Sequence, residues 1–351
     1  MSEQVAIVEK LTQLRDPFLN LTAEQMNLKA GLEATGNGYH LQLQAGFPIE
    51  TLDATYLPLL KEALGSKVQV TLESRIRPRK TQLAGHGLRG VKNTIAIASG
   101  KGGVGKSTVT VNLAVALAKA GARVGILDAD IYGPSIPLML GKHEPVQLQD
   151  DNYLPVKVHG LEAMSIGYLT DSEQALIWRG PMLAKSLLQM LDITLWNDLD
   201  YLFIDLPPGT GDIQLSLVQK IPLTAAVIVT TPQNVATLDA QKAIKMFEKT
   251  NIDVAGVVEN MSTHICSHCG HQEPIFGEGG GVQLSANFNV PLLGQLPLDS
   301  IIRHQADLGT PSASGNDPRA QQFSKIALRL AAAIAAKPLN YAEKFPPIKV
   351  E

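Results

Sequence analysis

Residues 100–108 read GKGGVGKST, and this stretch decides the fold. It follows the apolar run TIAIAS at 94–99 and precedes the helix-like run STVTVNLAVALAKAG at 107–121. The pattern fits the P-loop, in which glycine N–H groups wrap phosphates, a lysine reaches the β- and γ-phosphates and a serine hydroxyl binds Mg²⁺. The expected nucleotide-binding residues are therefore Gly100, Lys101, Gly102, Gly103, Val104, Gly105, Lys106, Ser107 and Thr108.

The same stretch also contains the dinucleotide-binding pattern G-x-G-x-x-G. In that alternative the pyrophosphate lies on a helix N-terminus, and Asp128 or Asp130 stands near the distance expected of a ribose-binding acid. It gives no role to residues 106–108. The P-loop uses all parts of the motif and also matches the strand before it and the helix after it, so a nucleoside triphosphate site with Mg²⁺ is favoured.

Short apolar runs alternate with helical stretches from Thr94 onward. Such alternation predicts an α/β protein with a mostly parallel sheet covered by helices on both faces, and ligands at the carboxyl ends of the strands. The runs are TIAIAS at 94–99, RVGILD at 123–128, YLFID at 201–205, AAVIVTT at 225–231 and VAGVVEN at 254–260.

Two of these runs end in acidic residues suited to nucleotide hydrolysis. YLFID ends in Asp205 and continues into LPPG, so Asp205 is the predicted metal-holding acid and Gly209 the predicted N–H donor to the γ-phosphate. RVGILD continues into ADIYGPS, which places Asp128 and Asp130 on a loop that can reach the metal and the attacking water. The predicted Mg²⁺ site is therefore Ser107, Asp128 and Asp205.

The chain divides into four parts by composition. We expect a small α+β domain at 1–75, with a hairpin turn at Gly36-Asn37-Gly38, and a basic, glycine-containing linker at 76–93. The P-loop domain is expected at 94–340, followed by a tail at 341–351.

Cys266 and Cys269 form a CxxC pair and are the only cysteines among 351 residues. A CxxC supplies two thiolates to one metal, whereas structural zinc sites and iron–sulfur clusters usually take four protein ligands. The alternatives are a structural disulfide, a redox dithiol, or half of a zinc site completed by nearby histidines. Those histidines are His264, His268 and His271.

The overall charge and hydropathy exclude some classes of partner. The formal net charge is −3 and the pI is about 6.3, which does not favour nucleic acid. No apolar run reaches the roughly 18 residues of a membrane span, and the N-terminus has no signal-peptide core. We therefore expect a cytoplasmic protein with neither nucleic acid nor membrane as a partner.

The extra lysine in GKGGVGKST, Lys101, resembles the deviant P-loop of the MinD/ParA/nitrogenase-iron-protein class of ATPases. The motifs DADIYGPSIPLMLG, WRGPM, DYLFIDLPPGTGD, TTPQ and VVENMS followed by CxxCG resemble the Mrp (ApbC) family of iron–sulfur cluster carriers. The N-terminal part is similar to the small domain that precedes many such ATPases: Asp16-Pro17 matches its start, but the cysteine of its cluster-handling relatives is absent.

This resemblance implies specific roles for residues and partners. ATP hydrolysis would use Lys101, Lys106, Asp130 and Asp205, with Lys101 acting on the partner's nucleotide in a homodimer and Asp130 orienting water. Asn260 would contact the adenine edge, or else only form a turn. Cys266 and Cys269 would hold a [4Fe–4S] cluster between two subunits, received from cluster scaffold proteins and delivered to apo iron–sulfur proteins.

Two other functions remain open at this stage. A MinD/ParA-like partitioning or positioning ATPase would share the P-loop, but a membrane-positioning relative would be expected to end in a basic amphipathic helix. Here Pro346-Pro347 interrupts the terminal sequence YAEKFPPIKVE. A zinc-binding P-loop ATPase would use the same CxxC, since both metals take thiolates.

Overall fold

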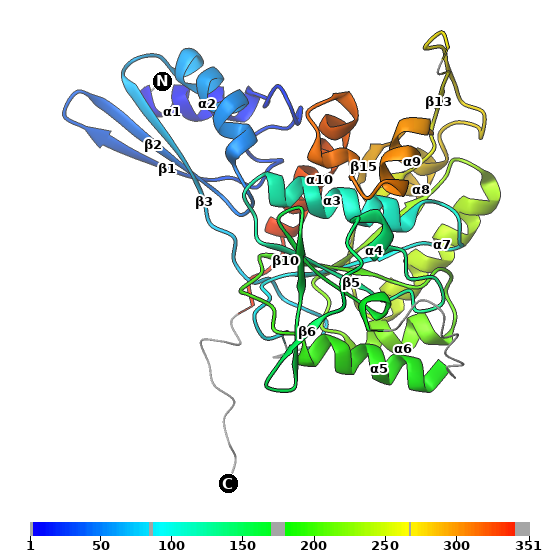
Figure 1. Ribbon diagram of the computed structural model, residues 1–351. Helices are drawn as coiled ribbons and strands as arrows, with labels where there is room; N and C mark the ends of the chain where they lie inside the picture. The colour runs from blue at the N-terminus through cyan, green and yellow to red at the C-terminus, as the bar shows by residue number, and fades with distance from the viewer. Residues whose placement is uncertain (1–2, 84–86, 170–179, 267, 341–351) are drawn as a thin grey trace.

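The computed structural model describes residues 3–83, 87–169, 180–266 and 268–340 (Figure 1). The predicted tail at 341–351, the start of the WRGPM motif and residues 84–86 of the predicted linker lie outside the described residues.

The core of the molecule is an eight-stranded sheet in which every neighbouring pair is parallel except the last. This confirms the predicted mostly parallel sheet. The sequence prediction missed three strands, β8, β9 and β15. In spatial order the strands are β15 (Leu292–Gln295), β12 (Val254–Glu259), β11 (Ala225–Thr230), β4 (Thr94–Ala98), β10 (Tyr201–Asp205), β5 (Val124–Asp128), β9 (Leu161–Ser165) and β8 (Val156–Val158).

Helices cover both faces of this sheet because alternate residues of each strand point to opposite sides. On β4, Ile95 and Ile97 join the core with α3 (Lys106–Lys119) and α10 (Pro318–Ala335). Ala96 and Ala98 join the core on the other face. The helices there are α5 (Gly180–Ile193), α6 (Asp212–Lys220), α7 (Asn234–Lys249) and α8 (Gly280–Phe288).

Several short elements lie outside the central sheet and the helices that cover it. They are α4 (Ile136–Met139), the β6–β7 hairpin (Gln147–Gln149 and Asn152–Leu154), a 3₁₀ turn (Ile166–Tyr168), the β13–β14 hairpin (His264–Ile265 and Gln272–Glu273), α9 (Ser300–Asp307) and a second 3₁₀ turn (Ser312–Ser314).

The N-terminal unit is a separate three-stranded sheet with two helices, drawn in blue in Figure 1. The predicted hairpin forms, with Thr35 paired to Gly38, and β2 then pairs with β3 in parallel across α2. The apolar side of this unit shares one continuous core with α3 and α10. Its elements are α1 (Glu3–Gln13), β1 (Lys29–Thr35), β2 (Gly38–Ala45), α2 (Glu50–Leu64) and β3 (Val68–Ser74).

Candidate functional site

Three loops that follow strands β4, β10 and β5 meet at the carboxyl edge of the sheet. These strands are adjacent, and the pairing sets Asp205 opposite both Ile97 and Asp128. Since β4 leads directly into the P-loop, the phosphate-binding segment and the two acidic segments predicted from the sequence lie side by side.

The shape of the P-loop depends on glycine at two positions. Gly105 precedes α3 with φ of 81°, and a Cβ there would lie 2.3 Å from the Asn260 amide nitrogen. A Cβ on Gly100 would lie 2.1 Å from the backbone of Asp239. Any side chain would therefore force the loop open.

Asn260 supports this loop from the end of β12. Its side chain is buried, and its amide nitrogen donates a 2.9 Å hydrogen bond to the carbonyl of Val104. In this conformation the Asn260 side chain therefore stabilises the P-loop backbone. The predicted contact with an adenine edge stays a prediction.

Asp205 is the centre of the predicted catalytic cluster. Its carboxylate is fully buried, and Oδ2 lies 2.8 Å from the Lys106 ammonium and accepts a 2.6 Å hydrogen bond from the Ser107 hydroxyl. The hydroxyl of Thr110 bonds the other oxygen, Oδ1, at 2.6 Å. The charge of Asp205 is thus compensated by one cation and two hydroxyl donors.

Thr110 was missed by the sequence analysis, although a signal for it existed. It stands four residues after Lys106, which places both side chains on the same face of α3. Its hydroxyl also lies 3.0 Å from the Lys106 carbonyl.

Asp128 and Asp130 differ in their surroundings. Asp128 is fully buried, and burial together with the nearby charge of Asp205 raises its pKa to about 7, against the opposing effects of Lys106 and Ser165. Its oxygens accept hydrogen bonds from Ser165 Oγ and from the N–H groups of Asp130 and Ile136. In this conformation Asp128 therefore supports the loop. Its predicted contact with magnesium stays a prediction.

Asp130 is only half-buried. Burial and Asp205 raise its pKa, and Lys106 opposes the shift. It lines a cavity of about 660 Å³ together with Tyr132, Pro207 and Pro208. Asp130 therefore faces a cavity and also interacts with the charges of Lys106 and Asp205, which suits a group that orients water.

The predicted contacts of Gly209 with the γ-phosphate and of Lys101 with the partner's nucleotide stay predictions. The N–H of Gly209 donates to the carbonyl of Ser99 at 3.0 Å, so a contact with a γ-phosphate requires that this bond break. The ammonium of Lys101 is partly exposed and has no hydrogen bond or ion pair to any residue that the structure describes.

The CxxC pair lies at the tip of the β13–β14 hairpin, which stands away from the body of the molecule (Figure 1). The N–H of Cys266 donates to the carbonyl of His271, and the N–H of Gly270, with φ of 72°, donates to the carbonyl of Cys266. Both cysteines are free thiols, Cys266 partly exposed and Cys269 exposed.

Hydrogen bonds within the tip favour the thiolate of Cys266. The N–H groups of Cys269 and His268, with the Cys269 thiol, lower the pKa of Cys266 below its ordinary value. A thiolate is the form that binds metal. Within the described residues, no group of three or more His, Cys, Asp and Glu side chains is placed to hold a metal ion.

A known family combines these features. The model of the NUBPL iron-transfer P-loop NTPases, of the ParA type, matches residues 90–331, well over half of the chain. The chain belongs to this family. It is a P-loop ATPase of the ParA/MinD type, which confirms the predicted enzyme class and fold.

Individual relatives agree with the family match. The iron–sulfur cluster carrier protein of Escherichia coli (strain K12) is 56% identical over 253 residues, covering 72% of this chain and 68% of the relative. The carrier protein of Deinococcus radiodurans is 42% identical over 344 residues, covering 95% of this chain and 97% of the relative, so that similarity extends into the N-terminal unit.

A solved structure shows the same fold with nucleotide bound. The nucleotide-binding protein from Archaeoglobus fulgidus, in complex with ADP, is 40% identical with a TM-score of 0.58, covering 66% of this chain and 90% of that one. No helix in the described part of this NUBPL-type ATPase is long and apolar enough to cross a membrane.

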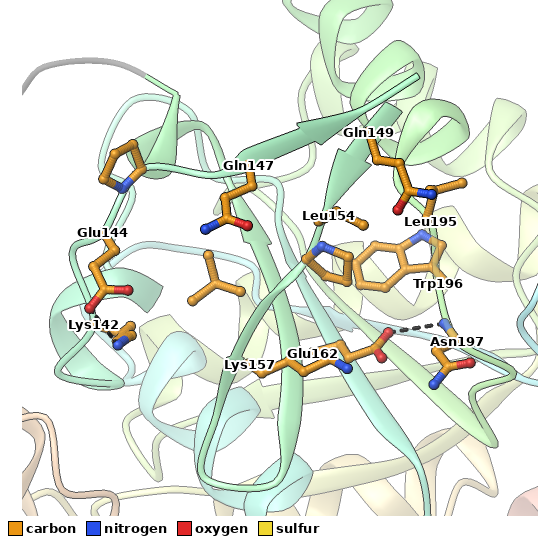
Figure 2. A pocket seen from close by; sticks show the side chains of 13 residues that line it. Lys142, Glu144, Gln147, Gln149, Leu154, Lys157, Glu162, Leu195, Trp196 and Asn197 are labelled. Carbon is orange, nitrogen blue, oxygen red and sulfur yellow. Dashed lines mark hydrogen bonds and ion pairs between the residues drawn. The ribbon is translucent and has the colours of Figure 1, made fainter. Parts of the chain in front are cut away.

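A second cavity of this NUBPL-type ATPase has a volume of about 590 Å³ (Figure 2). Gln147 and Gln149 of the β6–β7 hairpin line one side, with Trp196 beside them. On the opposite side Glu162 accepts a 3.1 Å hydrogen bond from the N–H of Asn197. None of the predicted site residues lines this cavity.

Proposed function

We propose that this protein is an ATP-hydrolysing iron–sulfur cluster carrier. Two copies hold a [4Fe–4S] cluster between their Cys266–Cys269 pairs and pass it to apo-proteins in the cytoplasm. The observation that carries the proposal is the exposed CxxC hairpin, with its thiolate-favouring tip, on a P-loop ATPase whose relatives are named iron–sulfur cluster carriers.

A two-fold homodimer explains how one CxxC can suffice. A two-fold axis repeats every residue, so an exposed pair close to that axis becomes four thiolates around one point. Four thiolates suit a cubane cluster. A cluster shared at an interface is also open to release when the interface changes.

Hydrolysis is assigned to the residues around Asp205. The P-loop N–H groups and Lys106 hold the phosphates, and Asp130 orients the attacking water. Ser107 and Asp205 supply the oxygen ligands that suit Mg²⁺, Asp205 through the metal's water shell, and the metal would supply charge neutralisation at the phosphates. The partly exposed Lys101 is free to reach the nucleotide of the partner subunit.

The hydrolysis assignment is tested by Lys106→Ala and Asp205→Ala. Both substitutions remove charge that neutralises the transferring phosphoryl group or its metal, so ATP turnover is expected to fall to background. Normal turnover in either variant would refute the assignment.

The proposed homodimer is tested by mixing inactive subunits. Lys101→Ala should retain nucleotide binding and lose most hydrolysis, as should Asp130→Ala. If Lys101 acts on the partner's nucleotide, a mixture of the two variants should recover part of the activity. No recovery at any mixing ratio would mean that the lysine acts within its own chain.

Cluster binding is tested by anaerobic reconstitution with iron and sulfide. We expect about four irons per dimer in the wild type and none in Cys266→Ala or Cys269→Ala. His268→Ala and His271→Ala are the matched controls: a thiolate-bridged cluster keeps its iron in both, whereas a zinc site that uses histidine loses metal. A stable cluster on a proven monomer, or zinc alone after anaerobic isolation, would refute the bridged cluster.

A further inference from the structure

Ser165 and Asp128 are the last residues of neighbouring strands. β9 and β5 pair in parallel with Ser165 opposite Asp128, and both side chains are fully buried. The Ser165 hydroxyl donates a 3.0 Å hydrogen bond to Oδ2 of Asp128. This contact lies outside the P-loop, and Ser165 was not among the site residues predicted from the sequence.

The carboxylate of Asp128 ties down both ends of one loop. Oδ1 accepts the N–H of Asp130 at 3.1 Å, and Oδ2 accepts the N–H of Ile136, at the start of α4, at 3.3 Å. The segment between these bonds carries Asp130. The orientation of the buried Asp128 carboxylate therefore fixes the positions of both ends of this loop.

The proton of the Ser165 hydroxyl has a defined direction. Its oxygen accepts the N–H of Gly167 at 3.1 Å, so the hydroxyl hydrogen is left for Asp128. A Cβ on Gly167 would come within 3.1 Å of the Pro137 side chain, so this segment is packed closely against α4.

Ser165 also counteracts the electrostatic repulsion between Asp128 and Asp205. Strand β5 lies between β10 and β9, so Asp128 has the carboxylate of Asp205 on one side and the hydroxyl of Ser165 on the other. Two buried carboxylates at neighbouring strand ends repel each other. The Ser165 hydroxyl, on the side of Asp128 away from Asp205, stabilises one orientation of the Asp128 carboxylate. In that orientation the carboxylate accepts the N–H groups of both Asp130 and Ile136.

We propose that Ser165 is a positioning residue for ATP hydrolysis, which acts through Asp128 on the loop that carries Asp130. The inference rests on the proposed role of Asp130 in orienting water. In this role Ser165 holds the carboxylate of Asp128, and that carboxylate holds the loop.

The test compares three serine variants. Ser165→Ala should lower kcat about 10-fold and change KM for ATP and the affinity for ADP less than about twofold, because only the loop with Asp130 is displaced. Ser165→Cys, similar in size with a weak donor, should recover part of the loss. Ser74→Ala is the matched control, since Ser74 likewise donates one side-chain hydrogen bond, at 2.8 Å to the carbonyl of Phe47, but does so in the N-terminal unit; its kcat should be unchanged.

Two readouts separate positioning from a general loss of structure. Hydrogen exchange of the Asp130 and Ile136 amides should accelerate in Ser165→Ala, while exchange in the central strands is unchanged. In a double-mutant cycle, Asp128→Asn and Ser165→Ala should be strongly non-additive in kcat, because both act on the same loop.

The inference is overturned by an unchanged kcat in Ser165→Ala, by a lower kcat without faster exchange at Asp130 and Ile136, or by additivity with Asp128→Asn. Its failure is distinguishable from failure of the proposed function. If Asp130→Ala abolishes turnover while Ser165→Ala is normal, only the positioning role is lost; if Asp130→Ala turns over normally, the role of Asp130 itself is refuted.

Discussion

At the scale of single residues, Asp205 is a buried carboxylate whose charge must be compensated by its neighbours. A fully buried carboxylate is costly unless it is paired and hydrogen-bonded. Its partners Lys106, Ser107 and Thr110 all come from the first turns of α3. The pairing therefore holds the start of α3 against the end of β10. Two of the three partners, Lys106 and Ser107, are also proposed to bind phosphate and metal.

We predict that Thr110→Val weakens both the fold and the catalysis. The substitution keeps the shape and removes the hydroxyl that bonds Asp205 Oδ1, which leaves a buried charge with one donor fewer. The free energy of unfolding should fall by about 1–3 kcal/mol, and kcat should fall more than KM changes. Thr110→Ser, which keeps the hydroxyl, is the control. Urea denaturation and steady-state kinetics measure both effects; equal behaviour of the two variants would contradict the prediction.

At the scale of elements, an ionic cluster joins the amino ends of the central strands. Asp200 precedes β10, and its carboxylate is paired with Lys92, ahead of β4, at 2.8 Å. It also accepts the N–H of Arg123, ahead of β5, at 2.9 Å. Burial raises the pKa of Asp200, but these bonds outweigh it and hold the pKa below its ordinary value.

A pH-dependent contribution to stability follows from this shift. Because the folded-state pKa of Asp200 is depressed, its contribution is present above the unfolded value, about 3.9, and is lost as pH falls through the folded value. Asp200→Asn should therefore cost about 1–3 kcal/mol at pH 7, and progressively less below about pH 4.

The exposed neighbour of Asp200 supplies the control for this prediction. Asp198 pairs with Arg123 at the surface, so Asp198→Asn should cost under about 1 kcal/mol at pH 7. Urea titrations of both variants between pH 3 and pH 7 measure the difference. A cost of Asp200→Asn that does not change with pH would contradict the ionic origin.

At the scale of the whole molecule, the N-terminal unit is seated on α10. The Asn27 amide donates to the carbonyl of Ala335 at 2.8 Å, and the Arg329 guanidinium donates to the carbonyl of Leu19 at 3.0 Å. Gly46 approaches Ala335 so closely that a Cβ would lie 2.7 Å from the Ala335 methyl group. The two parts share an apolar core, so we expect them to unfold in one transition.

Gly46→Ala tests this seating directly. The added methyl group must push apart the N-terminal unit and α10, and overpacking of this kind costs about 1–3 kcal/mol. Gly36→Ala, in the exposed hairpin turn, has no atom within 4 Å of the new methyl group and should be close to neutral. Thermal unfolding followed by circular dichroism compares the two. Equal melting temperatures would show that the unit is not held against α10.

The sequence by itself determined the features that short segments encode. The P-loop, the buried strands around it and the CxxC pair are each specified within about ten residues, because glycine conformation, strand periodicity and the spacing of two thiolates are local properties. The mostly parallel sheet followed from the alternation of such segments, and the family from several motifs together. Strands β8 and β15 were missed because three and four residues are too few to show a strand pattern. Strand β9, LEAMS, was missed because a glutamate and a serine interrupt its apolar run.

Only the tertiary structure decided which of these residues touch. Ser165 meets Asp128 because β9 lies next to β5, and strand order is not written in any one strand. Asn260 holds the P-loop across 156 residues of chain. The seating of the N-terminal unit on α10 likewise joins the two ends of the sequence. These contacts depend on packing between distant segments, where local propensity carries no information, and so they appear only once the sheet is assembled.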